Sequence, residues 1–171
     1  MGSTAEAPGR LVAVLRQLIT GWALLGGAVL LAVVAMNVGS VVSGALWRPF
    51  PGDFELTEVG VAVAVFAFLP YCELTGANVT ADIFTQRAQP RTIAILKVAG
   101  SLAAFLFAAL LVWRMSAGAI DQKTFNYTTT ILRVPIWWAY VPILISLGLL
   151  VVAAAMTLLA HLRAASQGNA G

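Results

Sequence analysis

Two glutamates, Glu58 and Glu73, interrupt an apolar stretch of the chain and are the first residues to consider for chemistry. A carboxylate in hydrocarbon is costly, and it marks proton relays or ion sites in membrane proteins. The two are fifteen residues apart, which is roughly 22 Å along a helix axis, so they lie at opposite membrane surfaces and cannot share a proton or a metal ion. We expect each to pair with a neighbouring base or a partner protein, with a proton relay as the alternative.

Enzyme and cofactor chemistry need groups that this chain does not offer. It has a single cysteine, Cys72, and a single histidine, His161. Thiol–disulfide enzymes need paired cysteines, and haem or metal sites draw on several histidines, cysteines or carboxylates. A small proton-coupled exporter needs a carboxylate deep in the membrane. We therefore predict no catalytic residue, no cofactor and no metal.

The composition predicts a membrane protein. Of the 171 residues, 60% are hydrophobic and 10% are charged, and the formal net charge is +3. Soluble domains carry about 25% charged residues, and no soluble core of this size could bury so much apolar surface. The ten lysines and arginines are scattered, which excludes a basic stripe for nucleic acid.

Four apolar segments predict transmembrane helices, at about residues 17–47, 54–76, 93–113 and 136–162. Each is long enough to cross a hydrocarbon core of about 30 Å, with some tilt. They define a transmembrane domain at residues 18–162, with polar tails at residues 1–17 and 163–171.

The connection between the second and third segments, residues 74–90, predicts a further short helix. Val79, Ile83 and Phe84 have helical spacing within it, and the polar residues Asp82, Gln86 and Arg87 lie elsewhere in the segment. Such a segment suits an amphipathic helix that lies in the membrane interface. The predicted fold is therefore an all-α integral membrane protein with four transmembrane helices and a short interfacial amphipathic helix.

Lysine and arginine counts near the ends of the segments predict the orientation. If the N-terminus is inside, six basic residues are cytoplasmic and four are outside. The cytoplasmic set is Arg10, Arg16, Arg87, Arg91, Lys97 and Arg163, and the outer set is Arg48, Arg114, Lys123 and Arg133. This bias places both tails in the cytoplasm.

Small and polar residues in the spans predict helix contacts. Asn37 is expected to make a hydrogen bond between helices. Small residues also repeat at four-residue spacing and would allow close helix packing. These are Gly39/Ser43, Ser40/Gly44, Gly60/Ala64 and Gly100/Ala104/Ala108.

The residues around residue 136 predict a helix that begins at the membrane surface. Trp137, Trp138 and Tyr140 follow a polar exposed loop at residues 114–133. Their rings favour hydrocarbon while their N–H and O–H groups need polar partners, so such residues concentrate at the interface. Pro135 is expected in the first turn of this helix, where its missing N–H costs little.

Three motifs stand in a recognisable order along the chain. Glu58 opens the second span, and residues 76–82 follow a Gly-x-His-Ile-x-x-Asp pattern with Asn78 in place of the histidine and Asp82 in register. A Thr-x-x-Leu-x-x-Pro-x-Trp-x-x-Tyr pattern is matched by Thr129, Leu132, Pro135, Trp137 and Tyr140. Over about residues 18–162, this arrangement resembles the small membrane subunit (Q-type, DctQ-like) of tripartite ATP-independent periplasmic (TRAP) transporters.

The resemblance implies a subunit of a secondary transporter in a bacterial inner membrane, and not an enzyme. Its partners would be a large permease (M-type) subunit, a periplasmic substrate-binding protein (P-type) and the phospholipid bilayer. In that family an ion gradient, typically sodium, drives the uptake of organic acids, and the large subunit holds the ion and substrate sites. This chain would then be a scaffold against which the transport domain slides.

Nine residues are candidates for structural or interface roles. They are Glu58, Glu73, Asp82, Arg87, Arg91, Pro135, Trp137, Trp138 and Tyr140. Two other functions stay open at this stage: a self-contained homo-oligomeric transporter or channel, and a tetraspan adaptor unrelated to transport.

Overall fold

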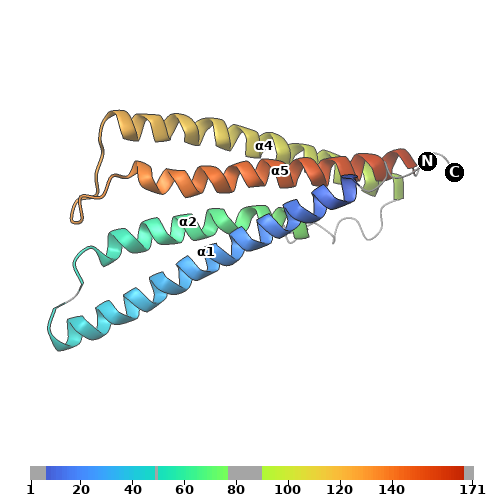
Figure 1. Cartoon of the computed structure of the whole chain (residues 1–171). Coiled ribbons are helices and arrows are strands. Elements are labelled where there is room, and N and C mark those ends of the chain that lie inside the picture. Colours follow the sequence, from blue (N-terminus) through green and yellow to red (C-terminus); the bar gives the residue numbers. More distant parts are fainter. Residues whose placement is uncertain (1–6, 49, 77–89, 168–171) are drawn as a thin grey trace.

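The computed structural model describes residues 7–48, 50–76 and 90–167, which are helical apart from short connections (Figure 1). The helices of this described part are α1 (Ala7–Leu46), α2 (Asp53–Thr75), α4 (Pro90–Thr124) and α5 (Trp137–Gln167). No β-strand occurs in the same residues, although an isolated bridge pairs Thr128 with Pro135. The interfacial helix expected between the second and third spans falls on residues 77–89, outside the described part.

All four of these helices are long and apolar enough to cross a membrane, which confirms the four predicted spans. Their apolar stretches are Val12–Leu46, Asp53–Thr75, Ile95–Thr124 and Trp137–Ala164. A continuous helix is the expected solution, because hydrocarbon offers no partner for a free backbone N–H or C=O.

The third span ends later than its charges suggested. The expected end was Trp113, just before Arg114, but α4 continues to Thr124. The exposed loop predicted at residues 114–133 is therefore shorter, at residues 125–136. The residues after Arg114 include good helix formers, alanine and methionine, and long charged side chains on a helix can reach water near the membrane surface.

The helices form two antiparallel hairpins that lie side by side. α1 packs against α2, α2 against α5, and α5 against α4, which is also their order across the bundle (Figure 1). α1 begins and α5 ends at one end of the bundle, which we call the terminal end. The opposite end, with the connections at residues 47–52 and 125–136, we call the loop end.

Small side chains are buried along α2 and α5. Ala64 and Ala67 of α2 are buried, as are Ala153 and Ala154 of α5, together with the larger Leu147. Helices in lipid gain little from hydrophobic association, so close van der Waals packing has to hold them together. Small residues allow that closeness.

Gly26 of α1 and Gly60 of α2 lie where the two helices are in close contact. A Cβ at position 26 would lie 2.6 Å from a side-chain carbon of α2, and a Cβ at position 60 would collide with Val33. The close contact expected at Gly60 is confirmed. Gly39 and Gly100 make no such contact within the described part of this chain, because a Cβ there would meet no atom of the described residues within 4 Å.

One polar contact joins the two hairpins in the middle of the bundle. The indole N–H of Trp22 on α1 donates a hydrogen bond of 2.8 Å to the hydroxyl of Ser146 on α5. Ser146 is fully buried and donates in turn to the carbonyl of Pro142 at 2.8 Å. The buried hydroxyl is thus satisfied as donor and as acceptor, as a polar group in an apolar environment requires.

Candidate interface at the loop end

Glu55, in the first turn of α2, holds the connection between α4 and α5. Its Oε1 accepts a hydrogen bond from the backbone N–H of Ile131 at 2.7 Å, and its Oε2 accepts one from the N–H of Leu132 at 3.1 Å. Hydrogen bonds to a carboxylate are charge-assisted and stronger than bonds between neutral groups. One side chain therefore joins the two hairpins at the loop end.

Leu132 adds an apolar contact between the connection from α4 to α5 and the start of α2. Gly52, which caps the start of α2, has a φ of 83°, a left-handed conformation that glycine adopts without steric cost. A Cβ at this position would lie 2.5 Å from Cγ of Leu132, so the leucine side chain rests directly on the glycine. The backbone conformation and the close approach both require glycine here.

Ser40 joins the last part of α1 to the start of α2. Its hydroxyl donates to Oδ2 of Asp53 at 2.5 Å and accepts the backbone N–H of Phe50 at 3.2 Å. Ser40 is only 4% exposed. A carboxylate at the first residue of a helix also complements the helix dipole.

Asn37 makes the contact between helices that its position predicted. Its side-chain N–H group donates to the hydroxyl of Thr57 on α2 at 2.8 Å and to the carbonyl of Val33 at 2.9 Å. The Thr57 hydroxyl donates in turn to the carbonyl of Asp53 at 2.6 Å. The prediction of a hydrogen bond between helices at Asn37 is confirmed.

The connection between α4 and α5 folds back on itself just before α5. Thr129 donates its N–H to the carbonyl of Val134, and Ile136 donates to that of Tyr127, both at 3.0 Å. Pro135 lies between these bonds, in an isolated bridge two residues before α5 begins, so its expected place in the first helical turn was wrong. In such a pair the flanking residues make the hydrogen bonds, and proline needs no N–H.

Two of the three predicted aromatics pack α5 against α4. The ammonium group of Lys123 lies 5.4 Å from the centre of the Trp137 ring, a distance typical of a cation–π contact. The ring of Tyr140 lies against Gly118, where a Cβ would be 3.4 Å from it. Trp138 contacts the Trp137 ring edge to face at 6.1 Å, yet it is 60% exposed and faces outward.

The remaining predicted residues do not gather with these. Glu58 is exposed on α2, whereas Glu73 is buried near the terminal end of the same helix. The structure thus separates the two glutamates, in agreement with their spacing in the sequence. Asp82 and Arg87 lie outside the described residues, and Arg91 lies in the first turn of α4, where its side chain is not described.

Glu55 was not among the residues predicted from the sequence. A glutamate in a first helical turn is explained by the helix dipole alone, so nothing local points to a further role. Its partners are backbone amides 76 and 77 positions away. Such a contact cannot be predicted from the sequence, because every residue other than proline has a backbone N–H group that could be the partner.

The polar side chains of Glu55, Asp53 and Ser40 at the loop end bond to other groups of the chain. Backbone amides occupy both oxygens of Glu55, and Ser40 bonds to one oxygen of Asp53. In the part of the chain that the structure describes, no three His, Cys, Asp or Glu side chains group as metal ligands. The arrangement can fix the geometry of two hairpins and present an exposed loop.

Comparison with known proteins identifies a family. Residues 30–164 match the family described as "Tripartite ATP-independent periplasmic transporters, DctQ component". No curated protein and no solved structure matches the chain significantly. The match covers α2 and α4, all of α5 except its last three residues, and residues 30–46 of α1. It includes Glu55 and its partners in the connection between α4 and α5. The chain therefore belongs to the DctQ family, the small membrane subunits of TRAP transporters.

Proposed function

We propose that this chain is the scaffold subunit of a TRAP-type secondary transporter in a bacterial inner membrane, with both termini in the cytoplasm. It would sit beside a large permease subunit that carries the ion and substrate sites. A periplasmic binding protein would deliver organic acids, and a sodium gradient would drive their uptake. Membership of the DctQ family supports the subunit role, and the basic residues near the ends of the spans support the orientation.

The observation that carries this proposal is that hydrogen bonds hold the two hairpins together while the outer surface of the bundle is apolar. Glu55 and Trp22 each cross from one hairpin to the other, which favours a fixed relative position of the four helices. Large apolar side chains point outward from the edge helices, with Leu31 and Val41 of α1 and Trp113 of α4 more than 70% exposed. A transporter whose mobile domain slides needs such a frame, firm inside and compatible with lipid or a partner outside.

Reconstitution in liposomes tests the proposal. We expect sodium-driven uptake of an organic acid when this chain, the large subunit and the binding protein are all present, and none when this chain is alone. Potassium in place of sodium tests the coupling ion. Uptake by this chain alone would contradict the scaffold role, and uptake by the large subunit and binding protein without it would show that the subunit is dispensable.

We also propose that the loop end faces the periplasm and contributes to docking of the binding protein. Phe125, Tyr127 and Ile131 are each more than half exposed there, and the first two rings lie 5.9 Å apart. Aromatic and apolar side chains of this kind are frequent anchors at protein interfaces. Replacing Tyr127 and Ile131 with serine should weaken binding of the binding protein to the membrane complex, measured by surface plasmon resonance. Unchanged binding would refute this part.

A further inference from the structure

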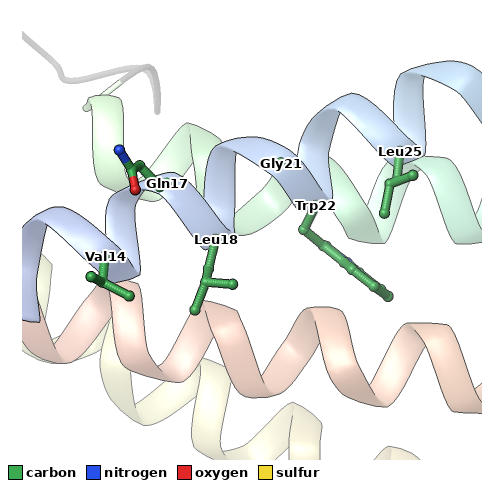
Figure 2. A pocket seen from close by; sticks show the side chains of 6 residues that line it. All are labelled: Val14, Gln17, Leu18, Gly21, Trp22 and Leu25. Carbon is green, nitrogen blue, oxygen red and sulfur yellow. The ribbon is translucent and has the colours of Figure 1, made fainter.

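A shallow groove of about 420 Å³ runs along α1 towards the terminal end (Figure 2). Its lining residues come from successive turns of this one helix. They are Val14, Gln17, Leu18, Gly21, Trp22 and Leu25. Gly21 leaves the middle of the groove open, because a Cβ there would meet no described atom within 4 Å. The Trp22 ring forms one wall and is held in place by its bond to Ser146.

The groove has a polar end and an apolar end. Arg10 precedes Val14 by one helical turn, and at about 100° per residue it lies within about 40° of Val14 around the helix. The Arg10 side chain is exposed. From Leu18 to Leu25 the lining is apolar apart from the indole N–H of Trp22, which Ser146 already accepts. A positive charge followed by an apolar groove complements a phospholipid, which has a phosphate followed by acyl chains.

The length of the groove fits an acyl chain. Eleven residues separate Val14 from Leu25, roughly 16 Å along the axis. That is about half of a hydrocarbon core of about 30 Å, the depth of one leaflet.

We propose that this groove binds an anionic phospholipid of the leaflet at the terminal end, with one acyl chain along Leu18–Leu25 and the phosphate at Arg10. Arginine is suited to phosphate because its planar group presents several donors. Anionic lipids are enriched in the cytoplasmic leaflet of cell membranes, which agrees with the orientation proposed above. The site lies before residue 30, outside the residues that match the family, and so does not depend on the transport function.

Titration of the full-length chain with phosphatidylglycerol and with phosphatidylcholine of the same acyl chains, followed by native mass spectrometry, tests the site. We expect a preference of about fivefold for phosphatidylglycerol, the contribution of one basic residue near anionic lipid. Arg10→Gln should abolish this preference without weakening phosphatidylcholine. Equal binding of the two lipids to the unaltered chain would overturn the assignment of the headgroup.

Substitutions that fill the groove provide a second test of the lipid site. Gly21→Leu should weaken both lipids by about tenfold, the loss expected when about two methylene groups are displaced. Gly39→Leu is the matched control on the same helix, since its Cβ also meets no described atom, and it should bind both lipids normally. Leu18→Trp fills the groove from an exposed position should Gly21→Leu fail to fold.

Two results would overturn the site itself. One is normal lipid binding in a folded Gly21→Leu or Leu18→Trp variant. The other is efficient crosslinking of a Leu18→Cys variant to the large subunit in the co-purified complex, because a protein segment would then occupy the groove.

Discussion

The helices of this protein meet in different ways at the loop end and in the middle of the bundle. At the loop end, Glu55 accepts hydrogen bonds from backbone amides 76 and 77 positions away, and Ser40 of α1 donates one to Asp53 of α2. In the middle, α2 presents alanines to its neighbours, and Gly26 touches the Cβ of Ala67. Directional bonds specify which residues face each other, whereas close packing in lipid supplies most of the attraction.

The difference follows from the surroundings. A carboxylate is tolerated near the membrane surface, where water and backbone amides can share it, but it is expensive in the hydrocarbon centre. Glu55 lies in the first turn of α2, and the stretch from Val59 to Cys72 contains no ionisable side chain other than those of Tyr71 and Cys72. We therefore expect overpacking in the middle to change stability most, and loss of the Glu55 hydrogen bonds at the loop end to change mainly the local order of the connection.

The largest effect is expected from Gly26→Leu. The new Cβ alone would lie 2.6 Å from Cβ of Ala67, so α1 and α2 must separate. Overpacking of this kind costs about 3 kcal/mol or more, measurable by unfolding in mixed detergent micelles. Gly39→Leu, on the same helix in open space, should unfold normally. Equal stability of the two variants would show that close packing does not hold this hairpin.

Gly52→Ala should destabilise the protein by about 2 kcal/mol, because it combines backbone strain with a clash against Leu132. Gly76→Ala is the matched control: its φ is also positive, at 65°, but a Cβ there meets no described atom within 4 Å. It should cost about 1 kcal/mol, the strain alone. The same unfolding assay compares them, and a Leu132→Ala change should rescue only the first. Failure of that rescue would contradict the contact.

Glu55→Gln should loosen the connection between α4 and α5 without unfolding the bundle. The neutral amide keeps one acceptor oxygen where the carboxylate has two, so one of the N–H groups of Ile131 and Leu132 loses its bond and the other bond is no longer charge-assisted. Hydrogen exchange of these two amides should become faster, on the order of tenfold. Glu58→Gln, three residues along and exposed, serves as the control and should leave the exchange rates unchanged. If both variants behave alike, Glu55 does not hold the loop.

The smallest effect is expected from Trp22→Phe. This variant keeps most of the ring and removes the N–H bond to Ser146, whose hydroxyl still donates to Pro142. A side-chain hydrogen bond between membrane helices contributes about 0.6 kcal/mol. A double-mutant cycle with Ser146→Ala measures the coupling. A coupling energy of zero would mean that the bond adds nothing beyond packing.

Much of the fold could be predicted from the sequence because the membrane imposes it. Apolar runs of sufficient length become helices in hydrocarbon, so all four spans were found and Asn37 was correctly expected to reach a neighbouring helix. The ends were harder to predict. α4 passes Arg114 because a charge near the membrane surface does not stop a helix, and Pro135 lies before α5 because the connection folds into a turn.

The sequence by itself determined that this chain has four segments long and apolar enough to cross a membrane and that it belongs to the DctQ family. Those properties depend on residue type and local spacing. Only the tertiary structure decided that Glu55, and not Glu58, joins the hairpins, that Gly26 and Gly60 are close contacts while Gly39 is not, and that a groove follows Arg10. Each of these contacts depends on which helix faces meet when the bundle packs. That packing involves backbone groups and distances that cannot be read from the types of the residues.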